Sequence, residues 1–178
     1  ERCLSEGTGF ELEVPITTAS GRHAWVRAIG RPETDGETVV AIHGTFQDIT
    51  ESRRREQAVA RLKTRFEAIF DNSESLIFIK DREGRLQLVN RAYRAASGVE
   101  RVDGLRDGDL YTPETAAALN AVDSAVFESG EPFFGEETIR FGDGREIVYL
   151  SSKFLIEDPV VGDRVLVGIA TDITSQKQ

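Results

Sequence analysis

Gly168-Ile169-Ala170-Thr171-Asp172-Ile173-Thr174 is a segment near the C-terminus that closes on Asp-Ile-Thr. A mostly β-branched run, Val165 to Ile169, leads into it and is typical of a buried strand. The same ending occurs earlier, as Gly44-Thr45-Phe46-Gln47-Asp48-Ile49-Thr50, after a second such run from Val39 to Ile42. Self-similarity at a fixed offset indicates a repeated structural unit. The chain is therefore predicted to hold two related units, each closing with a strand that leads into a helix.

The first unit, residues 1–50, is predicted to consist of strands alone. Extended segments are expected over 10–16, 23–31 and 38–47, with a hairpin connection at 32–36 that contains an Asp-Gly turn. Three antiparallel strands need their apolar face packed against another layer, and this part of the sequence offers no helix to cover it. We therefore expect the first unit to be the C-terminal part of a truncated domain.

The segment 51–70 is predicted to form an amphipathic linker helix, since neither Pro nor Gly interrupts it. Asp48 or Thr50 is placed to cap its first turn. Apolar residues recur along it at spacings of 3, 4 and 3, the pattern of a short coiled-coil seam: Val59, Leu62, Phe66 and Ile69. A seam of this length would dimerise only weakly by itself.

Residues 71–174 are predicted to form a complete α+β unit, followed by the start of an outgoing linker at 175–178. Strands are expected over 76–80, 86–89, 133–141, 146–156 and 164–172. Helices are expected over 91–96 and 113–127, and the Asp- and Gly-rich segment 103–109 is expected to be a loop. This order predicts an antiparallel five-stranded sheet with helices on one face.

The composition is that of an ordinary globular protein, with 39% hydrophobic and 30% charged residues. A formal net charge of -9 argues against a nucleic-acid-binding surface. The single cysteine, Cys3, excludes an intramolecular disulfide and fits the reducing cytoplasm, where we expect the protein to reside. No apolar run approaches the length of a membrane span, so we expect no membrane contact. Because the sequence contains no Met, we expect it to be a fragment or a processed chain.

Several segments, taken in order, resemble the PAS family of sensor domains. They are Phe66-Glu67-Ala68-Ile69-Phe70-Asp71-Asn72, Val89-Asn90-Arg91-Ala92-Tyr93, Glu137-Thr138-Ile139-Arg140, Asp143-Gly144-Arg145 and the terminal Gly-x-x-x-Asp-Ile-Thr. The resemblance covers residues 66–174 in full, whereas residues 10–50 match only the last three strands of a preceding PAS unit. It implies a PAS fold and a sensory module that signals, through the helix after Asp-Ile-Thr, to an output domain such as a histidine kinase or a diguanylate cyclase. The sequence contains no motif of such an output domain.

The cofactors that other members of this family carry do not fit these residues. A covalent flavin adduct requires a Cys on a helix beside the flavin, and the one Cys of this chain lies at position 3. Ligation of haem by the long helix requires a His, and 113–129 contains none. His23 and His43 fall on strands of the first unit and are expected to be surface or packing residues. We therefore expect no cofactor of these kinds.

Metal-site and enzyme motifs are also missing from the sequence. Asp103, Asp107 and Glu114 have the spacing of a calcium loop, but Leu105 occupies a position that needs an oxygen ligand, so helix caps and turns explain these acids better. There is neither a Gly-x-Ser-x-Gly elbow nor a phosphate loop. The acidic residues are expected in turns and at exposed strand positions. We expect neither a bound metal nor enzymatic activity.

The resemblance also implies a ligand cavity between the helices and the sheet. On this comparison the more polar face of the strand 146–156 turns inward. Seven residues are expected around the cavity: Phe78, Lys80, Tyr93, Ile139, Tyr149, Ser151 and Ala170. Such a pocket could hold a small anion or a polar metabolite.

The outward face of the same strand is predicted to be an interface. It carries Val148, Leu150 and Phe154, and three residues at the end of the linker helix are placed to cover part of it: Phe66, Ile69 and Phe70. An apolar stripe larger than one short helix can cover usually marks an interface. We therefore expect a homodimer through this face and the linker helix.

The sequence leaves two main hypotheses open. In the first, the complete domain binds a small ligand and relays its state through the Asp-Ile-Thr junctions, with four residues in the relay: Asp48, Thr50, Asp172 and Thr174. In the second, the domain is a ligand-free dimerisation and relay module with a filled core. A weaker third hypothesis is a sensor with non-covalently bound flavin or haem, which an absorbance spectrum would reveal.

Overall fold

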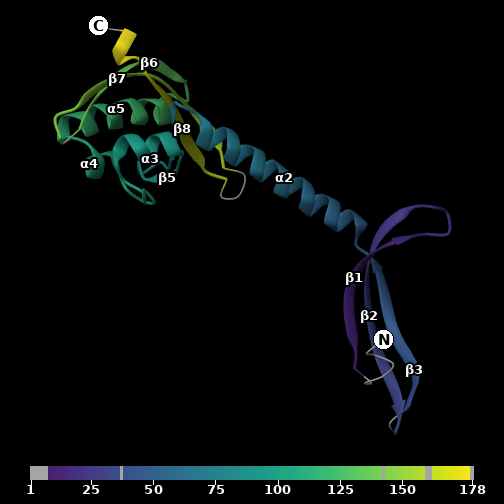
Figure 1. Cartoon of the computed structure of the whole chain (residues 1–178). Coiled ribbons are helices and arrows are strands. Elements are labelled where there is room, and N and C mark those ends of the chain that lie inside the picture. Colours follow the sequence, from purple (N-terminus) through teal and green to yellow (C-terminus); the bar gives the residue numbers. More distant parts are fainter. Residues whose placement is uncertain (1–7, 37, 142, 159–161, 177–178) are drawn as a thin grey trace. The chain divides into compact units, whose positions relative to one another are not determined.

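The computed structural model describes residues 8–36, 38–141, 143–158 and 162–176. Contacts divide the chain into two compact units, Glu1–Arg65 and Phe66–Gln178, and each is described by itself (Figure 1). Cys3 and the last two residues of the predicted outgoing linker lie outside the described residues. Within the described ranges, no helix is long and apolar enough to cross a membrane.

The first unit contains a three-stranded antiparallel sheet in the order β1 (Phe10–Thr17), β2 (His23–Asp35) and β3 (Thr38–Asp48). Residues paired across such a sheet share a face, and on one face the small side chains of Ala24 and Ala28 in β2 are buried. Four large apolar side chains on this face remain 38–79% exposed: Leu12, Ile16, Ile42 and Phe46. The sheet therefore presents an apolar face that no described element of this unit fully covers.

The connection between β2 and β3 is shorter than the predicted hairpin at 32–36. Strand β2 instead continues to Asp35, with a register shift between Glu33 and Thr34. Pro32 lies beyond Gly30, the last residue of β2 that pairs with β1, so it has a strand neighbour on one side only. Proline has no backbone N–H to donate. It is tolerated here because one side of the strand has no neighbouring strand that would need a donor.

Helix α2 (Thr50–Asn72) begins where β3 ends and extends slightly beyond the predicted 51–70. Its first turn is held by the three-stranded sheet. The guanidinium of Arg53 lies 4.0 Å from the ring centroid of Trp25 and donates to Glu13 at 2.7 Å. Farther along α2, the predicted seam residues are 53–75% exposed: Val59, Leu62, Phe66 and Ile69.

The end of α2 belongs to the second unit. Of the three residues expected to cover the sheet there, only Phe70 is buried; Phe66 is 53% and Ile69 75% exposed, so the prediction is wrong for these two. Phe66 stacks on Phe70 with ring centroids 5.2 Å apart. Successive residues of a helix point about 100° apart, so Ile69 cannot share the direction of its buried neighbour.

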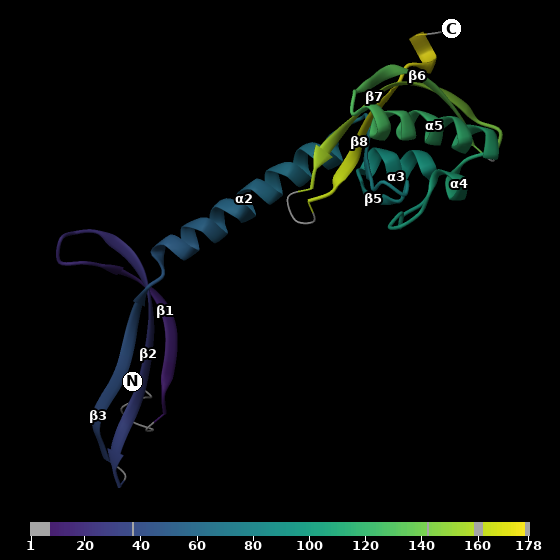
Figure 2. The same ribbon diagram turned by 180° about the vertical axis from the view of Figure 1, so that it is seen from behind.

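The second unit is the predicted five-stranded antiparallel sheet with helices on one face. Its strands are β4 (Leu76–Lys80), β5 (Leu86–Val89), β6 (Phe133–Arg140), β7 (Glu146–Glu157) and β8 (Arg164–Asp172), in the spatial order β5-β4-β8-β7-β6. The helices α3 (Arg91–Ser97), α4 (Asp107–Leu110) and α5 (Pro113–Ser129) lie together against the sheet, as Figure 2 shows from behind. The last described element is a short 3-10 turn, η1 (Thr174–Gln176).

Local signals in the sequence set the ends of α5, the longest helix that lies wholly within the second unit. The hydroxyl of Thr112 accepts a hydrogen bond from the backbone N–H of Thr115, and Pro113 occupies the first turn. Gly130 ends the helix in the left-handed conformation, with a φ of 75°. The four-residue α4 overlaps the end of the segment 103–109, for which the sequence predicts only a loop, so the prediction misses a helical turn.

The buried Asn90 joins three elements of this unit. Its side-chain oxygen accepts from the backbone N–H groups of Ile77 and Tyr93, both at 3.0 Å. Its amide group donates to the carbonyl oxygens of Phe70 at 3.0 Å and Ser75 at 2.9 Å. Asn90 therefore caps α3, as the sequence indicates, and also ties the end of α2 to β4.

Candidate functional site

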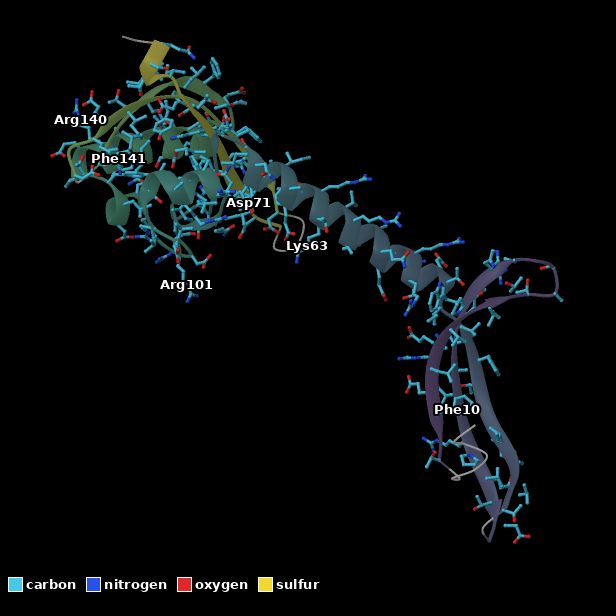
Figure 3. The ribbon with its side chains drawn as sticks, in the orientation of Figure 1. Phe10, Lys63, Asp71, Arg101, Arg140 and Phe141 are labelled. Atoms are coloured by element: carbon cyan, nitrogen blue, oxygen red, sulfur yellow. The ribbon has the colours of Figure 1, made fainter. Side chains whose placement is uncertain are left out.

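A cavity of about 30 Å³ lies under the sheet, and all seven predicted ligand residues line it. They come from β4 (Phe78, Lys80), α3 (Tyr93), β6 (Ile139), β7 (Tyr149, Ser151) and β8 (Ala170). Six further residues complete the lining: Leu76, Asp107, Tyr111, Leu119, Glu137 and Phe141. One of them, Phe141, is labelled in Figure 3 beside Arg140 at the end of β6. The structure thus brings the predicted residues together around one space.

The cavity is small but large enough for an occupant. One buried water needs roughly 10–15 Å³ of such space, whereas this cavity measures about 30 Å³. Larger hollows of about 430 and 400 Å³ lie over the turn at 81–83 and along α5, but none of the seven predicted ligand residues lines them. The space under the sheet fits one or two waters, or a molecule of a few heavy atoms.

Ser151 supplies an unsatisfied polar atom at this cavity. Its side chain is 1% exposed, and its Oγ is the one buried side-chain polar atom in the described ranges that has no hydrogen-bond partner. It shares the inward face of β7 with Tyr149 and Lys153, because alternate residues of a strand point the same way. Leaving a buried hydroxyl unpaired is unfavourable, and Ser151 Oγ is such a hydroxyl in the lining of the cavity.

Two tyrosines form a hydroxyl pair in the same lining. The Tyr111 hydroxyl donates to the Tyr93 hydroxyl at 2.9 Å. Burial raises the pKa of both groups, because the phenolate would lose its solvation there. Both tyrosines therefore stay neutral, and the Tyr93 hydroxyl retains its own proton for donation.

A network of buried ion pairs adjoins the cavity. The ammonium of Lys80 donates to Asp107 at 2.6 Å and to Asp123 at 2.8 Å. The ammonium of Lys153 donates to Asp123 at 2.7 Å and to Glu137 at 2.7 Å. All five side chains are less than 10% exposed. We call these five residues the ion network.

The ion network holds three carboxylates and two ammonium groups, so its formal negative charges outnumber its positive charges by one. Burial raises the pKa of Asp107, although the neighbouring Lys80 acts in the opposite direction. Burial also opposes the charge of Lys80, but Asp123 and Asp107 outweigh it and raise the pKa of that ammonium. The Lys80 ammonium therefore remains charged, and burial disfavours the ionised form of Asp107.

Sequence reasoning placed Lys80 at the cavity but missed its partners. Asp107 was assigned to a cap or turn, and the acids were expected in turns and at exposed strand positions; both expectations are wrong for the buried Asp107, Asp123 and Glu137. Signals were present in the sequence. Asp123 follows Leu119 by four residues on the apolar side of α5, and Lys153 shares its strand face with Ser151.

The two Asp-Ile-Thr junctions have the same hydrogen bonds. Asp48 accepts from the backbone N–H of Thr50 at 2.9 Å, and the Thr50 hydroxyl accepts from the backbone N–H of Trp25 at 2.9 Å. In the second copy Asp172 accepts from the N–H of Thr174 at 2.8 Å. The Thr174 hydroxyl accepts from the N–H of Val148 at 3.1 Å.

Each junction therefore joins the end of a strand to the next helical turn and to the neighbouring strand. The aspartate satisfies an amide at the start of that turn, as the sequence predicts for a cap. The threonine instead binds the adjacent strand, so its hydroxyl is not the cap. Hydrogen bonds from the side chain and backbone of Thr50 lower the pKa of Asp48. The relay role of these residues remains a prediction.

In the ranges that the structure describes, no group of three His, Cys, Asp or Glu side chains could hold a metal ion. Although Asp107, Asp123 and Glu137 belong to one network, each is bound to a lysine ammonium rather than to a shared centre. The network consequently acts as a set of hydrogen-bonded charges.

Comparison with known families identifies both units. A family model described as PAS fold matches residues 70–178, and one described as PAS domain matches residues 1–51. The chain belongs to the PAS domain family. The two PAS matches agree with the duplicated Asp-Ile-Thr junction, and the cavity lies inside the PAS domain of residues 70–178.

Proteins similar to this PAS chain include a regulatory histidine kinase and two PAS domains of known structure. Over 126 residues it is 33% identical to the methanogenesis regulatory histidine kinase FilI of Methanothrix harundinacea, covering 68% of this chain and 14% of FilI. A PAS domain of an HTR-like protein from Haloarcula marismortui has 23% identity and a TM-score of 0.56, over 68% and 99% of the two chains. A PAS domain from Colwellia psychrerythraea has 26% identity and a TM-score of 0.53, over 64% and 98%. The chain thus contains a PAS sensor module related to those of histidine kinases and spans a small part of such a kinase.

Proposed function

We propose that the PAS domain of residues 70–176 binds a small polar molecule in the cavity under the sheet. The unpaired Ser151 hydroxyl, 1% exposed, is the observation that carries this proposal. A buried polar group without a partner costs about 1–3 kcal/mol. A ligand that hydrogen-bonds to Ser151 would recover this free energy in the folded state, and binding would thereby be coupled to the conformation of β7.

The second part of the proposal concerns signal relay. Ser151 on β7 pairs with Ala170 on β8, two residues before Asp172. A ligand that shifts β7 against β8 would also shift the Thr174 hydroxyl, which is bound to Val148 of β7. We propose that this junction passes the state of the cavity to the helix that would follow and onward to an output domain. FilI is a regulatory histidine kinase, and a kinase is the output that we propose for the parent protein.

The remaining proposals concern context. The sensor module acts as a regulatory rather than a catalytic unit, in the cytoplasm and without nucleic-acid contact. It pairs with a second copy through the exposed seam of α2 and through the outer face of the sheet. That outer face includes Phe134 and Ile169, which are 73% and 36% exposed.

Mass spectrometry of small molecules released from the purified 178-residue chain tests ligand binding. The wild-type chain should release a bound molecule upon denaturation. Ser151→Val should release much less, because the substitution removes the hydroxyl and fills the cavity. Ser152→Val is the matched control: it changes the adjacent serine, which points to the opposite face of β7, and should retain the molecule.

Two results would overturn the binding proposal: a wild-type chain that releases no small molecule, or a Ser151→Val chain that retains as much as the wild type. The second candidate function, a ligand-free relay module with a filled core, would then stand. The cavity volume of about 30 Å³ and the charges that occupy the core favour that alternative. In that case Ser151→Val should stabilise the domain, because it fills the cavity and removes an unpaired hydroxyl, and it should leave regulated output unchanged.

A further inference from the structure

The charges around the cavity are unbalanced. Its lining contains one ammonium, from Lys80, and two carboxylates, from Asp107 and Glu137. Extending the count to the whole ion network adds Asp123 and Lys153 and leaves the same excess of one negative charge. An anionic ligand would enlarge this excess in a buried site, whereas a cation would neutralise it.

The aromatic residues of the lining favour the same charge. Five rings border the space: Phe78, Tyr93, Tyr111, Phe141 and Tyr149. Aromatic faces attract cations, and organic ammonium groups are commonly recognised by clusters of such rings. One such contact already occurs here, since the ammonium of Lys80 lies 5.2 Å from the ring centroid of Phe78.

The hydrogen-bond acceptors in the lining of the cavity indicate which kind of cation would bind there. The unpaired Ser151 Oγ can accept a hydrogen bond, and each carboxylate of the lining has a second oxygen besides the one that accepts from lysine. A metal ion does not suit the site, because the described residues contain no group of three metal-binding side chains. An N–H donor can bind these separate acceptors one by one.

We propose that the cavity selects a small organic monocation with N–H groups, of the alkylammonium class. Its ammonium would donate to Ser151 Oγ and to the carboxylates of Asp107 and Glu137, and its alkyl part would contact the aromatic rings. This inference rests on the proposed ligand-binding function of the same cavity and adds the chemical class. It also replaces the small anion that the sequence left open.

Nuclear magnetic resonance titration of the full chain tests the ligand class. The probes are methylammonium chloride, sodium acetate and acetamide, at one ionic strength held constant with sodium chloride. Methylammonium should produce saturable shifts of the amide signals of Ser151 and Ala170. Acetate and acetamide, of similar size but with negative or no charge, should produce none that saturate over the same range.

Two variants test whether the buried carboxylate of Asp107 is the charge that binds methylammonium. Asp107→Asn removes the excess negative charge and should weaken methylammonium binding by about tenfold or more, because it removes a charged acceptor. Asp103→Asn makes the same change at an exposed position in the preceding loop and should leave the affinity unchanged. Ser151→Ala should also weaken binding.

The outcomes separate this inference from the proposed function. Saturable shifts with acetate or acetamide but not with methylammonium would overturn the cation class and leave ligand binding in place. No saturable shift with any probe, or an affinity for methylammonium that Asp107→Asn does not change, would overturn the inference. Failure of ligand binding itself would instead appear as equal release from wild type and Ser151→Val in the mass-spectrometric experiment.

Discussion

Asp123 is the residue that joins the two buried lysines of the PAS domain, since its two carboxylate oxygens accept from Lys80 and Lys153 separately. Isolated charges could not be buried at these positions without a large loss of solvation. Each ammonium is stabilised by two carboxylates, so the members of the network are interdependent. The loss of one lysine leaves its former partners buried without their counter-charge.

We therefore predict that Lys153→Met destabilises the PAS domain by about 3–5 kcal/mol, the usual cost of removing one partner of a buried ion pair. All three tyrosines of the chain lie in this domain and the single tryptophan lies in the first unit. Near-ultraviolet circular dichroism of tyrosine during urea unfolding can therefore follow this domain. Arg140→Met, which removes an exposed ion pair with Glu146, is the control and should have little effect. A similar, small effect of both substitutions would contradict the prediction.

The free energy of unfolding of the PAS domain should depend on pH through the titration of Asp107. Burial raises its pKa above the usual 3.8, so the folded state binds this proton more tightly than the unfolded state. Its contribution is thus fully present below 3.8 and is lost as pH rises through the raised pKa. The charged and titratable groups that act on Asp107 are Lys80, Asp123, Lys153, Tyr93 and Tyr111.

Asp107→Asn removes this titration. Between pH 4 and the raised pKa, the wild type should lose stability relative to the Asn variant as pH increases. Urea unfolding of both proteins over that pH range measures the difference in the free energy of unfolding. If the wild type gained stability relative to the variant with increasing pH, the pKa of Asp107 would be lowered and the reading of the ion network would be wrong.

At the scale of elements, the two Asp-Ile-Thr junctions share one pattern of hydrogen bonds. In both copies the aspartate binds the amide of the threonine two residues later, and the threonine hydroxyl binds the preceding strand of the sheet. We propose that such a junction sets the direction in which the next element leaves the sheet. A small change at the junction can then alter the connected helix while the core is preserved.

Asp172→Ala should leave the PAS domain folded and its ligand retained. The loss of such a cap typically costs about 1 kcal/mol, too little to unfold a domain but enough to bias a two-state junction. In the parent protein with its output domain, the variant should lose regulation of output. The matched change Asp48→Ala should alter hydrogen exchange in residues 51–65 without affecting the cavity. Regulated output at the wild-type level in Asp172→Ala, or loss of ligand in either variant, would exclude the relay role.

Elements with a repeating pattern could be predicted from the sequence, whereas isolated turns and distant pairs could not. The strands β4, β5 and β8 begin and end where the apolar runs predicted. Helix α4 was missed because its four residues, Asp-Gly-Asp-Leu, are too few to show a helical period. The predicted cavity lining came from resemblance to PAS domains rather than from periodicity, which alone could not tell the two faces of β7 apart.

The ion network could not be predicted from the sequence, for a different reason. Its pairs are separated by 16 to 43 residues along the chain, so no local pattern connects Lys80 with Asp107 or Asp123. In addition, the sequence alone does not distinguish a buried lysine from an exposed one. Only the arrangement of β4, α4 and α5 around one space shows that these charges meet.

At the scale of the whole molecule, the main open question is what covers the apolar side chains that remain exposed. In the first unit, Phe46 is 79% exposed on a sheet face that the described residues of that unit leave uncovered. Along α2, Leu62 is 65% and Ile69 75% exposed, at coiled-coil spacing. Surfaces of this kind usually mark contacts with another protein. Because the exposed residues of α2 repeat at coiled-coil spacing, a second copy of the same chain is the partner that we propose.

We predict that the purified chain forms dimers at micromolar concentration, as measured by light scattering over a dilution series. Leu62→Glu should shift the equilibrium toward monomer by placing a charge in the seam of α2, and Leu150→Glu should do so at the outer sheet face. Ile29→Glu is the matched control: Ile29 is also partly exposed, at 37%, but lies on β2 of the first unit, outside both the α2 seam and the outer face of the five-stranded sheet. A strict monomer at high micromolar concentration would refute the dimer. Equal dissociation by all three substitutions would show that added charge, rather than loss of a specific contact, drives the change, and the seam would then have no special role.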